Sequence, residues 1–168
     1  LPGAPALSRF RLDKLLGELQ SLDPRVSGLS ARFHHFVDLE RPLDDAGHAV
    51  LARLLEYGTE DAADVPGELV IVIPRPGTIS PWASKATDIA HVCGLTGIAR
   101  IERGVAYRIA ASAALDAAAL TRLAAPLHDR MTESVCLALD EAGSLFAHHS
   151  PRPLASVPLR SGGRAALV

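Results

Sequence analysis

The chain has 168 residues, about the length of one ordinary domain, which is enough to bury a core. Its composition, 48% hydrophobic and 21% charged, is typical of a globular fold and excludes a disordered tail. The 17 basic and 19 acidic side chains give a net charge of −2, which argues against a nucleic-acid-binding or polybasic membrane-binding surface, and no apolar run approaches the ~20 residues that span a bilayer.

Apolar residues at helical spacing predict a first helix over residues 8–22, with Pro24 just beyond its end. Strict alternation of apolar and polar residues then predicts a long, half-buried strand over residues 28–40. The outward face of this strand would carry Arg32, His34, Phe36 and Asp38. A face of this kind is expected to meet water or a partner.

Asp44 or Asp45 is expected to cap a second helix, which ends at Gly58. Residues 59–67 form a predicted acidic loop. The apolar run at 68–74 is typical of a central strand, because strands that are buried on both faces do not alternate.

The second half of the chain follows a similar order. Helical spacing predicts a helix over residues 84–93, and alternation predicts a strand over residues 98–110. The outward face of that strand would carry Arg100, Glu102 and Arg108. Asp116 is expected to cap a further helix, and Pro126 either breaks it or starts another that runs to about residue 142.

The end of the chain has a different composition. A short extended piece is predicted over residues 154–159, and the prolines and glycines of residues 150–163 are typical of a linker. We therefore expect one domain over residues 1–150 and the start of a linker over residues 150–168.

These elements predict an α+β fold in which helices pack on one face of an antiparallel sheet, in two pseudo-repeated halves at about 7–74 and 83–159. Gly28 and Gly97 open the two long strands, and a similar Leu-x-Arg-Leu tetrapeptide recurs in both halves at the same offset. Two similar halves without a duplication are the alternative.

Two cysteines, Cys93 and Cys136, are too few for a disulfide framework or a cysteine-rich zinc site. We therefore expect reduced thiols and a cytoplasmic location. The chain starts at Leu1 without a methionine or a basic-then-apolar leader, so we expect a piece of a longer protein and no signal peptide.

The segment from Pro74 to Leu95 is the most informative part of the chain, since it follows a central strand and opens a helix. Ser80 is a good N-cap, with Pro81 at the first helical position. Arg75, Thr78 and Ser80 are expected to converge at the helix N-terminus, which favours anions. The alternative is that Ser80 only caps the helix.

The helix itself carries two predicted stripes. The apolar stripe, expected to be buried, consists of Ala86, Ile89, Ala90 and Cys93. The polar stripe consists of Ser84, Thr87, Asp88 and His91. This polar stripe either forms a site or faces water. Trp82, the only tryptophan, marks an interface or the core.

Neither catalysis nor metal binding is predicted from the residues. The polar stripe holds a serine, an aspartate and a histidine, but the chain lacks the Gly-x-Ser-x-Gly elbow of serine hydrolases. Cys93 lies on the apolar stripe without a partner base, so we expect a buried structural thiol. The neighbours His34 and His35 point to opposite faces of a strand, and there is no phosphate loop or dinucleotide fingerprint. We therefore predict no catalytic residue, no metal and no cofactor within these residues.

Several motifs together resemble the N-terminal domain of the large single-chain phosphoribosylformylglycinamidine synthase, or formylglycinamide ribonucleotide amidotransferase. They are Pro5–Phe10, Phe33–Leu39, Arg75–Trp82, Ser84–His91, Cys93–Leu95, Arg100–Tyr107, Leu127–Glu133 and Leu145–His149. The resemblance covers nearly the whole chain. Ala83 departs from it, because the family commonly has serine there.

The resemblance implies an enzyme of purine biosynthesis that converts formylglycinamide ribonucleotide to the amidine, using ATP, magnesium and ammonia released from glutamine. In this family the N-terminal domain is neither the synthetase nor the glutaminase domain. It looks like two fused copies of the small companion subunit of multi-subunit synthases. ATP, magnesium and the glutaminase nucleophile would therefore belong to segments beyond Val168.

We accordingly expect a non-catalytic assembly and coupling domain, whose partners are the synthetase and glutaminase domains of the same chain. It would hold them in register and support ammonia transfer. The candidate interface or ligand residues are Arg75, Thr78, Ser80, Trp82, Ser84, Lys85, Asp88 and His91. The alternative is a direct contribution of this segment to the ribonucleotide site or to the ammonia path. A free-standing regulatory domain is a more distant alternative.

Overall fold

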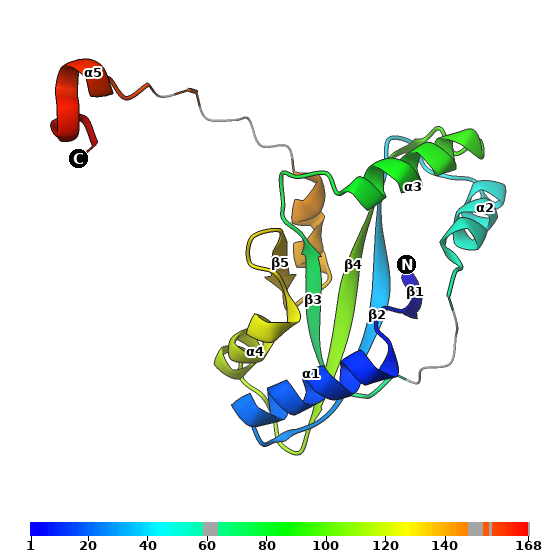
Figure 1. Cartoon of the computed structure of the whole chain (residues 1–168). Helices are drawn as coiled ribbons and strands as arrows, with labels where there is room; N and C mark the ends of the chain where they lie inside the picture. Colours follow the sequence, from blue (N-terminus) through cyan, green and yellow to red (C-terminus); the bar gives the residue numbers. More distant parts are fainter. Residues whose placement is uncertain (59–63, 148–152, 155, 168) are drawn as a thin grey trace.

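A five-stranded antiparallel sheet forms the centre of the chain, with strand order β1-β2-β4-β3-β5 (Figure 1). The computed structural model describes residues 1–58, 64–147, 153–154 and 156–167. The strands are β1 Pro2–Pro5, β2 Val26–Leu39, β3 Glu68–Pro74, β4 Ile98–Ala111 and β5 Glu133–Cys136.

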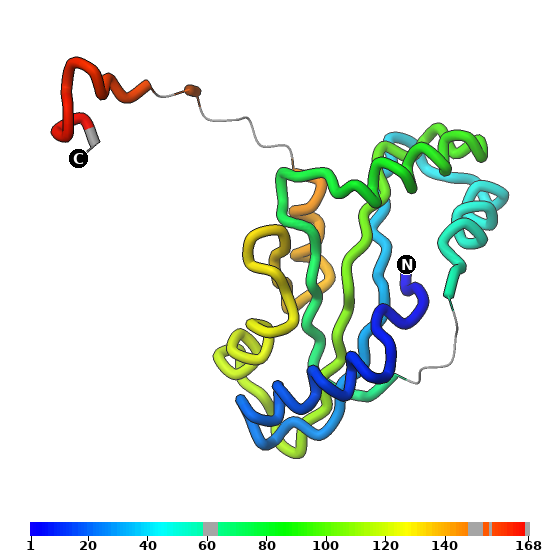
Figure 2. The backbone as a smooth tube through the Cα atoms, in the orientation of Figure 1, coloured from blue at the N-terminus to red at the C-terminus, as the bar shows by residue number. Residues whose placement is uncertain are grey.

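The two long strands, β2 and β4, form the central pair and run side by side (Figure 2). Leu29 lies opposite Ile109, and Val37 lies opposite Ile101. Because side chains alternate between the faces of a strand, these apolar residues share one side of the sheet. Both predicted long strands are confirmed.

Four helices cover that side, and each begins where the sequence supplies a cap. They are α1 Arg9–Leu22, α2 Asp45–Leu55, α3 Pro81–Val92 and α4 Ala117–Ala124. The N-cap residues are Ser8, Asp44, Ser80 and Asp116, and each side chain accepts a hydrogen bond from the backbone N–H three residues later. The shorter helices are η1 Ala125–Leu127, η2 Asp140–Phe146, α5 Leu159–Gly162 and η3 Gly163–Leu167.

The core divides into three clusters. On the helical side, α1 and α4 bury Leu19 and Leu123 against one half of the sheet. On the same side, α2 and α3 bury Leu51 and Ala90 against the other half. On the opposite side, η2 buries Leu145 against β3 and β5. The predicted α+β architecture with an antiparallel sheet is confirmed. The helices were predicted on one face; α1 to α4 lie there, whereas η2 lies on the other.

The interpretation of residues 126–142 as a helix is wrong. Pro126 lies in the short helix η1, and the chain then extends as β5 and pairs with β3 before it forms η2. Four residues, Glu133–Cys136, are too few to establish an alternating pattern. The strand exists because β3 offers an unpaired edge, which local periodicity does not reveal.

The expectation of a polar, uncovered sheet face is also partly wrong. The Glu102 side chain is fully buried, and the Arg100 guanidinium lies 4.9 Å from the centre of the Phe146 ring. The reason is that η2 and the loop after β3 cover this part of the face. Arg108, farther along β4, is exposed as expected.

Several expectations about organisation stay predictions. The order helix–strand–helix–strand occurs twice, as α1-β2-α2-β3 and α3-β4-α4-β5, but nothing tests a duplication or the domain boundaries. The acidic loop lies partly outside the described residues, as does the linker. Leu159 begins a helix rather than ending an extended piece. Among the helices of the described residues, none is long and apolar enough to cross a membrane.

Candidate functional site

The candidate segment begins with a turn that the sequence dictates. The Thr78 N–H donates to the Arg75 carbonyl over 3.1 Å, with Pro76 and Gly77 at the two central positions. Gly77 has a φ of +83°, the left-handed conformation that the third position of a type II turn requires. This turn redirects the chain from the end of β3 toward the start of α3 at Ser80.

Helix α3 then occupies the place of a missing strand. The last paired residue of β3 against β4 is Val72, opposite Val105, so within the described residues the remaining part of β4 has no strand on that side. The Thr87 Oγ1 accepts a hydrogen bond from the Ile101 N–H over 3.0 Å. The His91 Nε2–H donates to the Ile98 carbonyl over 2.7 Å. Two residues of the predicted polar stripe therefore satisfy backbone groups of the open edge of β4.

The N-terminus of α3 already holds a carboxylate from within the chain. Glu102 accepts from the Ser80 N–H over 3.3 Å and from the Ser80 hydroxyl over 2.9 Å. The Ser80 hydroxyl oxygen in turn accepts from the Ala83 N–H over 3.0 Å. A carboxylate at this position complements the partial positive charge of a helix N-terminus. The predicted anion site at Ser80 thus contains an anion of the protein itself.

Arg100 links this arrangement to the other side of the sheet. Its Nε lies 3.6 Å from Glu102 Oε1, and its Nη2 donates to the Leu145 carbonyl. Alternation of residues along β4 predicted the side of Arg100 and Glu102, but not the segments that cover them. The pair connects the start of α3 with η2.

Arg103 is the centre of an aromatic cluster that sequence reasoning missed. Its guanidinium lies 4.1 Å from the centre of the Phe33 ring and 4.7 Å from that of Trp82, distances typical of cation–π contacts. Its Nη1 donates to the Tyr57 hydroxyl over 3.2 Å, and this hydroxyl lies 2.6 Å from His35 Nε2. Because arginine only donates, the Tyr57 hydrogen is left for His35 Nε2 to accept.

Burial lowers the pKa of His35 to about 4, with the nearby positive charges adding to the effect, so the imidazole is neutral at pH 7. Phe33, His35 and Arg103 all belong to the predicted inward face of the long strands. The sequence signal that could have revealed this cluster is the position of His35 and Arg103 among the apolar residues of the inward faces. Trp82 belongs to this half-buried cluster and also reaches the surface.

The remaining candidates are on the surface. Arg75, Thr78, Ser84, Lys85 and Asp88 are exposed. The loop at residues 128–132 lies beside the start of the segment, because the Arg75 N–H donates to the Thr132 carbonyl and its Nη1 donates to the Met131 carbonyl. The ion pairs within the described residues do not include Arg75 or Lys85.

The predicted apolar stripe of α3 is partly wrong. Ala90 is fully buried, but Ile89 is 47% exposed and Cys93 is also exposed. The helix lies along the edge of β4, so only its side facing β4 and α2 is covered. The interpretation of Cys93 as a buried thiol is therefore corrected. Cys136 is the buried cysteine.

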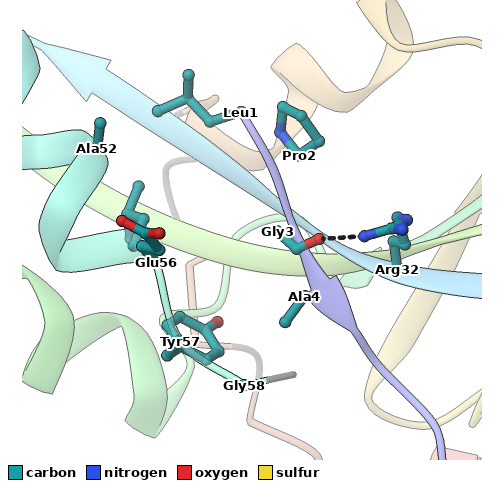
Figure 3. A pocket seen from close by; sticks show the side chains of 10 residues that line it. Leu1, Pro2, Gly3, Ala4, Arg32, Ala52, Glu56, Tyr57 and Gly58 are labelled. Carbon is teal, nitrogen blue, oxygen red and sulfur yellow. Dashed lines mark hydrogen bonds between the residues drawn. The ribbon is translucent and has the colours of Figure 1, made fainter. Parts of the chain in front are cut away.

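A cavity lies between β1 and the end of α2 (Figure 3). Its volume is about 490 Å³, and Arg32, Glu56 and Tyr57 line it. The Arg32 guanidinium binds the Asp64 carboxylate over 2.7 Å and the Gly3 carbonyl over 3.3 Å. This arrangement, together with the Glu56 carboxylate, disfavours a phosphate there. Within the described residues, no group of three His, Cys, Asp or Glu side chains is arranged to hold a metal ion.

A comparison with protein families agrees with the resemblance in the sequence. A family model described as formylglycinamide ribonucleotide amidotransferase N-terminal matches residues 32–146. The match begins within β2 and ends with η2, so it includes all eight candidate residues and the aromatic cluster around Arg103.

Proposed function

This chain belongs to the formylglycinamide ribonucleotide amidotransferase N-terminal family, and from this membership we propose that it is a non-catalytic assembly domain. The family places the chain in a synthase of purine biosynthesis. In our proposal, the domain holds the synthetase and glutaminase domains of the same chain in register and so supports the transfer of ammonia between them. ATP and magnesium bind to other segments of that chain, and the enzyme is cytoplasmic.

One observation carries the proposal: the segment 75–92 combines internal anchoring with outward cations. Ser80 is hydrogen-bonded to Glu102, and Thr87 and His91 are hydrogen-bonded to backbone groups at the edge of β4. Arg75, at the start of the turn, and Lys85, near the start of α3, are both exposed. A segment that is anchored by these hydrogen bonds and presents two cations is suited to docking onto a carboxylate of a neighbouring domain.

The second candidate function is a direct contact with the phosphate of the ribonucleotide. Arg75 and Lys85 remain available for it, but the helix N-terminus does not favour it. A phosphate near Ser80 would meet the Glu102 carboxylate, and like charges at short distance repel. We therefore rank a carboxylate of a neighbouring domain above substrate phosphate as the partner of these two cations.

The test uses the full-length enzyme with Arg75→Ala and Lys85→Ala. We expect turnover with glutamine to fall by more than turnover with added ammonia, because misaligned domains lose ammonia that added ammonia replaces. The matched controls are Arg9→Ala and Lys14→Ala, which remove exposed charges from α1. A raised KM for the ribonucleotide with both nitrogen sources would instead support the substrate site. Unchanged turnover in both variants would contradict both functions.

A further inference from the structure

The buried Glu102 carboxylate lies between two groups that can bind it. Its Oε2 accepts a hydrogen bond from the Ser80 hydroxyl over 2.9 Å, and its Oε1 accepts one from the Ser80 N–H over 3.3 Å. Oε1 also lies 3.6 Å from Arg100 Nε, which is within ion-pair distance but beyond the roughly 2.7–3.2 Å of an N–H···O hydrogen bond. Arg100 Nε is buried, and no atom in the described part of the chain accepts a hydrogen bond from it. Ser80 therefore holds the carboxylate, while Arg100 Nε stays close to it without a hydrogen bond.

Helix η2 holds Arg100 in this arrangement. The Arg100 Nη2 donates to the Leu145 carbonyl, and the guanidinium lies 4.9 Å from the centre of the Phe146 ring. Both contacts are at the end of η2, which packs on β3 and β5 through Leu145. The guanidinium is thus shared between η2 and Glu102. A displacement of η2 would leave the guanidinium free to turn toward Glu102.

A guanidinium and a carboxylate have a stronger arrangement than the one seen between Arg100 and Glu102. Arginine presents parallel N–H donors, and a carboxylate that meets them side by side uses both of its oxygens. Both Glu102 oxygens are bound to Ser80 in the structure. Turning the two oxygens toward Arg100 would draw them away from Ser80. Because Ser80 is the N-cap of α3, the start of this helix would then lose its anchor.

We infer that Glu102 is a two-position switch, which η2 controls through Arg100. With η2 in place, Arg100 is held at Leu145 and Phe146, and Glu102 anchors Ser80. When η2 moves away from the sheet, Arg100 forms the side-by-side pair with Glu102, and the start of α3 loosens. The inference goes beyond the proposed function, because it concerns how the segment 75–92 is held and not what this segment binds.

Hydrogen exchange of the full-length enzyme, measured by mass spectrometry, tests this switch. Phe146→Leu keeps an apolar side chain on η2 but removes the ring that holds Arg100. We expect the amides of residues 81–86 to exchange about fivefold faster, the change that loss of an N-cap produces, while the amides of α1 stay unchanged. Phe146→Tyr keeps the ring and should leave both segments unchanged. The matched control is Leu139→Ala, which shortens an exposed side chain just before η2 and should also change neither segment.

Substitutions of Arg100 distinguish the switch from a general loss of packing. In an Arg100→Met background no guanidinium draws Glu102 from Ser80, so Phe146→Leu should no longer accelerate exchange over residues 81–86. Arg100→Lys keeps a positive charge but cannot form the side-by-side pair, and we expect the same result in its background. Four outcomes would overturn the inference: no acceleration in Phe146→Leu, an equal acceleration over α1, the same acceleration in Leu139→Ala, or an acceleration by Phe146→Leu that persists in either Arg100 background.

Discussion

Glu102 offers the sharpest test of how the candidate segment is held. Its buried carboxylate accepts two hydrogen bonds from Ser80 at the start of α3 and lies 3.6 Å from Arg100 Nε. Hydrogen bonds to charged groups contribute roughly 1.5–3 kcal/mol to stability. Glu102→Gln keeps the shape and one acceptor oxygen, so we expect it to cost about 1–2 kcal/mol. Glu102→Leu removes both acceptors and leaves Arg100 without its carboxylate, so we expect a loss of about 3 kcal/mol.

The assay is urea unfolding followed by circular dichroism. With a slope of about 2 kcal/mol/M, the larger loss lowers the midpoint by roughly 1–2 M. The matched control is Glu18→Gln, an exposed carboxylate on α1, for which we expect a change within about 0.5 kcal/mol. A double-mutant cycle with Ser80→Ala separates the hydrogen bonds from general packing, and we expect a coupling of about 1 kcal/mol. A Glu102→Leu variant as stable as the parent chain, or zero coupling to Ser80, would refute this account of the segment.

Two further properties follow from burial. The pKa of His35 falls to about 4 in the folded chain, whereas the unfolded chain binds this proton below about pH 6.5. The free energy of unfolding is therefore highest above pH 6.5. It decreases by up to about 3 kcal/mol as the pH falls toward 4. Urea midpoints measured between pH 7 and 5 test this, and His35→Gln should flatten the dependence; an equally steep dependence would rule the explanation out. For the thiols, Cys93 is exposed and Cys136 is buried, with burial raising the pKa of Cys136. The Cys93 thiol should therefore react with a chromogenic disulfide in the native chain, and the Cys136 thiol only in denaturant. Cys93→Ser should remove the fast phase of this reaction with little change in stability. Two thiols that react fast in the native chain would contradict the packing around Cys136.

Local signals predicted the elements with long, regular patterns. The four cap residues Ser8, Asp44, Ser80 and Asp116 set the starts of the four helices, because a cap and the helix behind it are close in sequence. The two long strands were predictable for the same reason, since alternation over many residues specifies which side chains share a face. That these two strands pair with each other was not predicted, because alternation specifies the face of a side chain and not the neighbouring strand.

The failures have a common cause, which is contact between distant segments. Strand β5 depends on the free edge of β3, and the burial of Glu102 depends on where β3 stops pairing with β4. Alternation assigns Glu102 to a side of the sheet, but it contains no information on what covers that side. The same applies to Cys93, which belongs to the predicted apolar stripe but is exposed at the C-cap of α3.

The polar stripe of α3 shows how a structural and a functional role divide among neighbouring residues. Thr87 and His91 face the open edge of β4, where unpaired backbone groups require partners. Lys85 lies on the same helix but borders an apolar groove toward α2, which Leu54 and Ile101 also line. One helix therefore replaces a strand along one side and presents a charged, apolar-lined groove along another. This division gives the polar residues of the segment two separate roles. It also predicts that variants on the β4 side lower stability, whereas variants on the groove side change the coupling between domains.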